Sequence, residues 1–191
     1  MTRAEVLEIV RQYASGYFLM DNGEGLQWYS SRVHALIPLD ERFHVPSSLR
    51  RALNKSRFET RINADFSATV DGCAQRAETW ITPELKQIYF ALHRFGFAHS
   101  FETWVDGQLG GAMLGLSIGG AFIGESMFYR VPEASKVAMV RLKEHLNTRG
   151  FALFDAQIQN PHLARFGAFE LPEKEFKKLL SSAVKLEVSF V

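Results

Sequence analysis

The sequence is poor in cysteine and in uninterrupted apolar stretches. Its single cysteine, Cys73, excludes a disulfide within the chain and a cysteine-rich zinc site, and we expect it to be a small buried hydrophobe. No segment reaches the length that spans a bilayer. The first residues carry charges at helical spacing where a signal peptide would be apolar. We therefore expect a protein of the cytoplasm that contacts no membrane.

An excess of one charge is also lacking. Lys and Arg number 22 against 21 Asp and Glu, which gives a formal net charge of +1. The total charge therefore provides no argument for binding nucleic acid, and any basic surface must be local.

Motifs for binding phosphate or metal and for covalent catalysis are missing. The chain has no Gly-x-x-x-x-Gly-Lys-Ser/Thr loop, and its six histidines show no paired ligand spacing, so we expect neither a cofactor nor a metal. Ser126 is not part of a Gly-x-Ser-x-Gly elbow, and no histidine lies near Cys73 in the sequence, so an acyl-enzyme lacks support. The glycines between residues 110 and 120 fall in or near an expected hairpin, where we interpret them as allowing bulges, twist or close approach.

What the chain does contain is enough apolar material for a core. Its 191 residues, 47% of them hydrophobic, suit one domain with a small appendage. Periodicity and cap residues predict helices at 6–13, from 46, at 66–73, from 83, from 132 and from 172. Apolar or alternating runs predict strands at 58–62, 100–105, from 109, 121–123 and 151–154, an edge strand at 184–190, and a pairing of 26–29 with 35–39. Asp106-Gly107 predicts a type I′ turn. These elements indicate an α+β fold with a boundary near residue 57.

Two carboxylates stand out because they lie among apolar residues. Glu125 and Asp155 both fall where strands are expected, and a buried carboxylate is unfavourable unless it has a partner. Gln157 is two residues after Asp155, so strand alternation predicts both side chains on one face, and Asn160 follows where the strand ends. These polar groups suggest a site.

Structural roles for these residues remain open. Asp155 and Asn160 could cap the next helix, and Glu125 could pair with Arg130. In the other interpretation the carboxylate lies beside an apolar pocket that would accept a small hydrophobic amine, lined by Met113, Phe122, Met127 and Phe128. Core packing would explain those four residues equally well.

Longer motifs surround these residues. They are Gly124-Glu125-Ser126-Met127-Phe128, Ala134-Ser135-Lys136, Thr79-Trp80-Ile81-Thr82, Ala98-His99-Ser100 with Glu102 and Trp104, and Asp155-x-Gln157-x-x-Asn160-x-His162 with Gly167-Ala168. Together they resemble the leucyl/phenylalanyl-tRNA-protein transferase family, from about residue 16 to about residue 176. The chain departs from the family pattern at Gly16-Tyr17-Phe18-Leu19 and at Glu173-Lys174.

The resemblance implies a fold and an activity. The fold is α+β, with a GNAT-like mixed sheet flanked by helices in residues 58–191 and a small N-terminal α/β appendage in residues 1–57, reduced relative to the family. The activity is transfer of Leu or Phe, with Met as a further candidate, from aminoacyl-tRNA to the α-amino group of proteins that begin with Arg or Lys, which creates an N-degron. The implied partners are therefore aminoacyl-tRNA and the acceptor protein, and we expect a monomer.

The resemblance also implies roles for individual residues. Asp155 and Gln157 would form the reaction centre, and Glu125 would orient the substrate amine. Substrate would further contact Met113 and Phe122 in the side-chain pocket, Asn160 beside it, and the aromatic residues Trp80, Trp28 and Tyr29 around the terminal adenosine and the acceptor peptide.

These assignments suggest a mechanism of positioning. An aminoacyl ester is already activated, and an α-amino group with a pKa of about 7.7 to 8.0 is partly neutral near pH 7. We expect Gln157 to orient this amine, polarised by a hydrogen bond with its neighbour Asp155, so that proximity supplies most of the rate. Affinity for tRNA would come from a local basic face made of Arg50, Arg51, Lys55, Arg57 and Arg61, unless these side chains are only a solvated helix surface.

Two other functions fit the same residues. One is a GNAT-type N-acyltransferase that uses acyl-CoA, although residues 128–131 lack a glycine-rich loop for a pyrophosphate. The other is a non-catalytic binder of hydrophobic N-terminal residues.

Overall fold

The computed structural model describes residues 1–53, 57–76 and 79–191. It contains a seven-stranded sheet of order β4-β5-β6-β7-β8-β3-β9 and a separate two-stranded sheet of β1 and β2. The strands are β1 Phe18–Asp21, β2 Leu26–Tyr29, β3 Val33–Leu36, β4 Glu59–Ile62, β5 Ala98–Val105, β6 Gln108–Ile118, β7 Ala121–Tyr129, β8 Leu153–Gln157 and β9 Phe169–Pro172. The pairs are antiparallel except β7 with β8, which is parallel, so the α+β class is confirmed.

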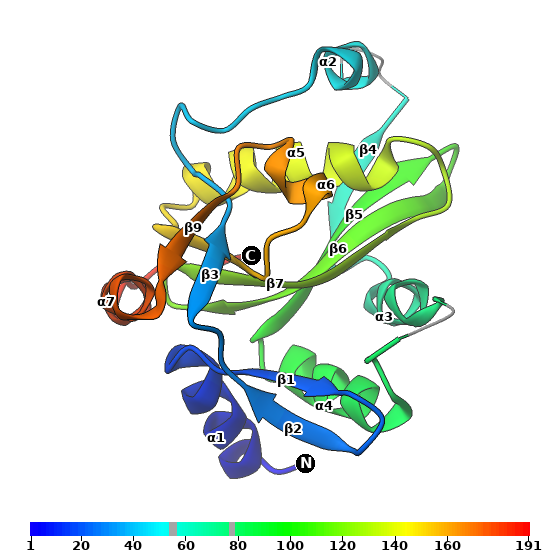
Figure 1. The fold of residues 1–191 in the computed structure, drawn as a ribbon. Coiled ribbons are helices and arrows are strands. Elements are labelled where there is room, and N and C mark those ends of the chain that lie inside the picture. The colour runs from blue at the N-terminus through cyan, green and yellow to red at the C-terminus, as the bar shows by residue number, and fades with distance from the viewer. Residues whose placement is uncertain (54–56, 77–78) are drawn as a thin grey trace.

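Helices cover both faces of the large sheet (Figure 1). They are α1 Arg3–Ala14, α2 Ser47–Leu53, α3 Phe66–Ala74, α4 Pro83–Arg94, α5 Ala134–Thr148, α6 Pro161–Ala164 and α7 Glu173–Ala183. Strand β6 shows how alternation builds two cores. Ala112, Leu114 and Leu116 pack with α1, α3 and α4, whereas Met113 packs on the other face with α5.

Local sequence signals set several of these boundaries. Thr82 caps α4 by accepting a hydrogen bond from the backbone N–H of Leu85, and Pro83 follows at the first helical position. Asp106 and Gly107 both have positive φ, 51° and 74°, so the turn between β5 and β6 is of the type that the sequence predicts.

Two strand predictions are wrong. Residues 26–29 form β2, but its partner is β1, while β3 lies between β8 and β9. Residues 184–190 form no strand. At the C-terminal end, side chains of α5 and of the residue after it bind the backbone carbonyls instead: Arg149 donates to the Ser189 and Val191 oxygens, and His145 lies 2.7 Å from the Phe190 oxygen. Phe190 of the alternating run is buried against Phe122, with ring centroids 5.3 Å apart, whereas Leu186 is exposed.

Strand β3 links the two ranges that the sequence separates at residue 57. It belongs to the first range by sequence, yet it is hydrogen-bonded into the large sheet between β8 and β9. The division into residues 1–57 and 58–191 stays a prediction.

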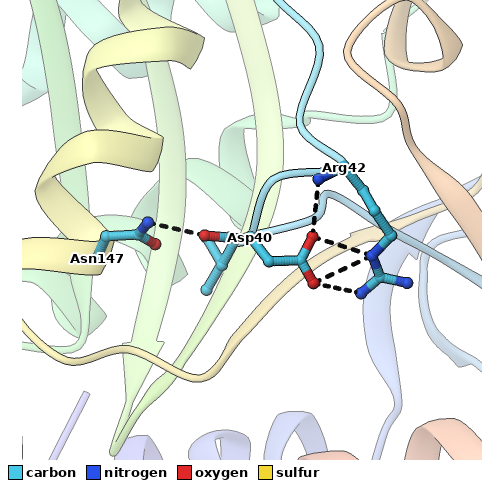
Figure 2. A network of polar contacts seen from close by, with 4 residues as sticks. Asp40, Arg42 and Asn147 are labelled. Atoms are coloured by element: carbon cyan, nitrogen blue, oxygen red, sulfur yellow. Dashed lines mark hydrogen bonds and ion pairs between the residues drawn. The ribbon is translucent and has the colours of Figure 1, made fainter.

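The loop between β3 and α2 is held against α5. Figure 2 shows Asn147 of α5 donating to the Leu39 carbonyl, 2.7 Å away, next to the pair formed by Asp40 and Arg42. The Arg42 guanidinium contacts both Asp40 oxygens and lowers the pKa of that carboxyl to about 2. Because this loop leads into α2, these contacts help to fix the position of that helix.

Candidate active site

A pocket of about 260 Å³ opens where β7 and β8 separate. The last paired residues are Ile123 and Asp155, although β7 continues to Tyr129 and β8 to Gln157. The side chains and backbone that line the space between the strands come from Phe18, Leu19, Met20, Arg76, Trp80, Met113, Gly124, Glu125, Ser126, Met127, Met139, Phe154, Ala156, Gln157, Ile158, Gln159, Asn160 and Leu163.

A β-bulge places Glu125 in this pocket. Leu114 of β6 pairs with Ser126 and Gly115 pairs with Gly124, which leaves Glu125 as an extra residue on β7 without a partner. Gly115 is required here, because a Cβ atom would collide with the Phe122 ring and the Ile123 carbonyl oxygen. A register shift at this position therefore turns the carboxylate towards the gap between the strands.

Glu125 is buried and accepts two hydrogen bonds. The Tyr89 hydroxyl of α4 donates to Oε2 over 2.7 Å, and the Gln157 side-chain Nε2 donates to Oε1 over 3.0 Å. Burial, with a smaller contribution from the nearby Asp155 charge, raises the pKa of Glu125 to about 7, against the opposing effect of the hydrogen bonds from Tyr89 and Gln157. The carboxyl therefore titrates close to neutral pH.

Tyrosines from two helices form the floor behind Glu125. Tyr13 of α1 and Tyr89 of α4 are both buried, and burial together with the Glu125 charge raises the pKa of each hydroxyl well above its usual value. Both hydroxyls therefore remain protonated, and Tyr89 donates its proton to Glu125, whereas the Tyr13 hydroxyl has no hydrogen-bond partner among the described residues. Sequence reasoning missed them, because nothing local connects either tyrosine to a strand residue so far along the chain.

Gln157 has an unusual backbone. Its φ is 61°, in the left-handed region that residues other than glycine rarely adopt. The Asp155 carboxylate accepts a hydrogen bond from the Gln157 backbone N–H over 2.8 Å and supports this conformation. Asp155 is itself buried and does not line the pocket.

This geometry corrects two expectations. Strand alternation predicted the Asp155 and Gln157 side chains on one face, and this is wrong because the φ of Gln157 is not that of a strand. Asp155 was also expected to polarise the Gln157 side-chain amide, and this is wrong. Asp155 accepts from the Gln157 backbone N–H, and Glu125 is the residue that accepts from the side-chain amide. Since the amide Nε2 faces Glu125, the amide Oε1 is the group left to accept a hydrogen bond from a substrate amine.

The predicted substrate residues fall into two groups. Met113, Trp80 and Asn160 line the pocket, whereas Phe122, Trp28 and Tyr29 do not. Phe122 is fully buried and packs edge-on against Phe154, which lines the pocket in its place. Trp28 packs on Tyr13, and Tyr29 stacks on Phe18, another lining residue, so both contact residues of the site from behind.

Asn160 also has the structural role that was left open. Its side chain accepts hydrogen bonds from the backbone N–H groups of His162 and Leu163 and caps α6. The suggested pair of Glu125 with Arg130 is absent from the described residues: the Arg130 guanidinium lies 5.3 Å from the Phe128 ring centroid instead.

Methionines dominate the apolar lining. Four of them, Met20, Met113, Met127 and Met139, come from β1, β6, β7 and α5. Their unbranched side chains adapt to ligands of different shape. The volume lies just below the usual range for drug-sized ligands, which suits a group such as one amino-acid side chain. The sequence did not predict Met20 and Met139 as pocket residues, because no motif points to a site in their segments.

The predicted basic residues lie outside this pocket. Arg50 and Arg51 are exposed on α2, which stands at the top of Figure 1, and Arg57 is also exposed. Arg61 is paired with Glu59, 2.9 Å away, and its guanidinium lies over the Trp104 ring. Lys55 lies outside the described residues. The assignment of these residues to tRNA stays a prediction.

The described part of the chain lacks two further features. No group of three or more His, Cys, Asp or Glu residues there could hold a metal ion. None of the helices described is both long and apolar enough to cross a membrane.

Comparisons with known proteins agree with one another. A family model described as leucyl/phenylalanyl-tRNA protein transferase matches residues 36–181. A protein of that name from Thermosynechococcus vestitus is 59% identical over 183 residues, which cover 96% of this chain and 93% of the relative. Relatives of the same name from Synechococcus sp. and Herpetosiphon aurantiacus are 56% and 46% identical, over 98% and 95% of this chain and 99% and 95% of their own lengths. The chain belongs to the leucyl/phenylalanyl-tRNA protein transferase family.

Proposed function

We propose that this protein transfers Leu or Phe from aminoacyl-tRNA to the α-amino group of proteins that begin with Arg or Lys. Family membership supports the use of aminoacyl-tRNA and a protein acceptor. The observation that carries the proposal is the pocket itself, in which a methionine-rich wall meets the hydrogen-bonded pair of Glu125 and Gln157. Such a wall suits an apolar aminoacyl side chain, and the pair suits the amine that attacks next to it.

The reaction needs positioning more than acid-base strength. The neutral amine nitrogen attacks the ester carbonyl carbon, a C–N bond forms, and the C–O bond to the terminal ribose breaks. The proton lost by the amine passes to the departing ribose oxygen. Gln157 Oε1 accepts a hydrogen bond from the amine and fixes its direction, and holding the reactants in contact can supply several kcal/mol of the barrier. No acyl-enzyme is required.

Glu125 acts in this proposal mainly through Gln157. Its hydrogen bond with the amide Nε2 fixes the orientation of the amide and makes Oε1 a better acceptor. Its charge also favours an amine that arrives as an ammonium ion, because a nearby cation stabilises the ionised carboxylate. Glu125 is thus a positioning residue for the nucleophile.

Three broader expectations remain proposals. The large sheet would be GNAT-like, and the parallel pair β7 and β8, which separates beside the pocket, supports this proposal. Residues 1–57 would form the small appendage. The protein would act in the cytoplasm as a monomer, where aminoacyl-tRNA and proteins with new N-termini are available.

The decisive experiment is a transfer assay. The full chain is incubated with labelled Phe-tRNA and an Arg-initiated peptide, and a Glu-initiated peptide serves as the matched control. We expect label in the Arg-initiated peptide only. Label that remains on tRNA would indicate a non-catalytic binder of hydrophobic N-terminal residues. Acetyl transfer from acetyl-CoA in a parallel reaction would favour the acyl-CoA-dependent N-acyltransferase.

We expect Gln157→Ala and Asp155→Asn to slow turnover with little effect on tRNA affinity. The first removes the acceptor for the amine, a hydrogen bond of about 1 to 1.5 kcal/mol, and should lower kcat about tenfold. Asp155→Asn replaces the carboxylate that accepts from the Gln157 backbone N–H with a weaker, neutral acceptor. Single-turnover rates and filter binding of Phe-tRNA check both, with Gln87→Ala on the exposed surface of α4 as the control. Parallel losses of rate and affinity would contradict the assignment.

Reversing the charges of Arg50 and Arg51 should weaken tRNA binding and reduce its salt dependence. Each phosphate contact contributes about one unit to the slope of log K against log salt, so Arg50→Glu with Arg51→Glu should reduce the slope by about two. The control is Lys174→Glu with Lys178→Glu on α7, which makes the same change of net charge on another exposed helix. An unchanged slope would reject α2 as a tRNA contact.

A further inference from the structure

A second hollow adjoins the active-site pocket. Its volume is about 340 Å³, and the residues that line it are Gly72, Gln75, Arg76, Met127, Phe128, Tyr129 and Arg130. We call it the arginine groove. Arg76 and Met127 line the active-site pocket as well, so a ligand that extends out of that pocket can continue into the groove.

The Arg76 side chain is held at the border between the two spaces. Its Nη2 donates to the Met127 carbonyl oxygen over 2.7 Å and approaches the Ser126 hydroxyl at 3.3 Å. The guanidinium carbon lies 5.4 Å from the Trp80 ring centroid. A guanidinium carries five N–H donors, so these contacts leave donors for an anion.

Arg130 is oriented by a ring on the floor of the groove. Its guanidinium carbon lies 5.3 Å from the centroid of Phe128, whose ring is buried under α3. Gly72 permits this close packing, because a Cβ atom there would lie 2.6 Å from the ring. Among the described residues, no carboxylate is within ion-pair distance of Arg130 or Arg76. Two cations therefore face the groove, more than enough to offset the partial negative charge of about one half at the C-terminus of α3.

Tyr129 adds an exposed aromatic ring to these cations. It is the last residue of β7, and its side chain is 66% exposed. An exposed ring next to arginine side chains is the combination that binds single-stranded nucleic acid, since bases stack on the ring while cations hold the backbone.

We propose that the arginine groove binds the nucleotide that precedes the aminoacylated terminal adenosine of the tRNA. Arg76 and Arg130 hold the phosphate between the last two nucleosides, and Tyr129 stacks on the penultimate base. This inference rests on the proposed function. The acceptor polypeptide is a poorer occupant, because under that function its first side chain is itself a cation and would be repelled by both arginines.

The test compares three donors that carry the same Phe ester. Phenylalanyl-adenosine ends before the phosphate, phenylalanyl-cytidylyl-adenosine includes the phosphate and the penultimate base, and Phe-tRNA is the whole substrate. The quantity measured is kcat/KM for the dinucleotide ester divided by kcat/KM for the nucleoside ester. We expect Arg130→Ala to lower this ratio about tenfold, as expected for a lost hydrogen bond between charged groups. Tyr129→Ala should lower it about fivefold, and Tyr129→Phe should restore it.

Arg94→Ala is the matched control. Arg94 is also exposed with its guanidinium over a phenylalanine ring, 4.9 Å from the Phe95 centroid, but it lies outside the groove. It should leave the ratio unchanged. An unchanged ratio in Arg130→Ala and Tyr129→Ala, or a raised KM for the acceptor peptide alone, would overturn the inference. If the wild-type protein transfers Phe from none of the three donors, the proposed function itself fails and the inference falls with it.

Discussion

The Glu125→Gln variant should be almost inactive in transfer and yet more stable than the wild-type protein above pH 7. The substitution keeps the shape of the side chain but removes its charge. Its amide oxygen can accept from Gln157, and the Tyr89 hydroxyl, unlike the indole N–H beside Glu102, can turn to accept from the amide nitrogen. Loss of the charged partner of Gln157 should lower kcat about 100-fold, the value of a hydrogen bond to an ion of about 2 to 3 kcal/mol.

The stability gain has a defined pH window. The pKa of Glu125 is raised from 4.5 to about 7 on folding. Between these values the folded protein retains a proton that the unfolded chain has lost, so the stability of the wild-type protein falls as pH rises. A shift of this size corresponds to about 3 kcal/mol, all of it lost above pH 7. The variant does not lose this stability, so its advantage should grow by that amount between pH 4.5 and pH 8.

Urea denaturation at several pH values measures this difference directly. The control is Glu144→Gln, the same substitution at an exposed position of α5. Its stability should run parallel to that of the wild-type protein. If the curve of Glu125→Gln is also parallel, then Glu125 titrates normally and the account of its burial is wrong.

The Glu102→Gln variant should lose about 3 kcal/mol of stability. Glu102 is completely buried in β5 and accepts three hydrogen bonds. Oε1 accepts from the Ser100 hydroxyl and the Asp65 backbone N–H, and Oε2 accepts from the Trp104 indole. A glutamine amide can replace only one of these oxygens as an acceptor, so its N–H₂ group would face the indole N–H or the other two donors.

A double-mutant cycle distinguishes this reason from general disruption. Trp104→Phe removes the indole donor, so an amide nitrogen at position 102 no longer opposes another donor. We expect the double variant to be clearly more stable than the sum of the two single changes predicts, with an interaction energy of about 1 kcal/mol or more. Thermal and urea unfolding provide the measurement. Additive losses would mean that the indole contact is not the source of the cost.

The sequence predicts the fold best where the signal is local. Thr82 followed by Pro83 marks the start of α4, and Asp106-Gly107 marks the turn of the central hairpin, because each uses only the conformational preferences of neighbouring residues. The predicted pairing of residues 26–29 with residues 35–39 was wrong, because strand pairing depends on residues far away in the sequence. The alternation in residues 184–190 was misread as a strand: the segment begins as a turn after α7, Leu186 is exposed, and Phe190 is the residue that reaches the core.

The candidate site shows the same division. The predicted site residues Glu125, Gln157, Met113 and Trp80 do meet in one pocket. Phe122 and Phe154 are paired neighbours on parallel strands, and no composition argument could tell which of them lines the cavity. The bulge at Glu125 and the left-handed backbone at Gln157 decide where these side chains point, and both depend on hydrogen bonds that only the folded chain contains.

The backbone of Gln157 has a consequence for protein engineering. A left-handed residue with a Cβ atom is strained by about 1 kcal/mol or more, which Gln157→Gly would relieve. Glu125→Gln would be favoured above pH 7 for a different reason, because it removes a carboxyl whose pKa is raised on folding. A directed-evolution campaign that selects heat resistance alone should therefore favour the replacement of both residues. Any search for a sturdier variant needs a simultaneous screen for transfer, because at these two positions stability and activity oppose each other.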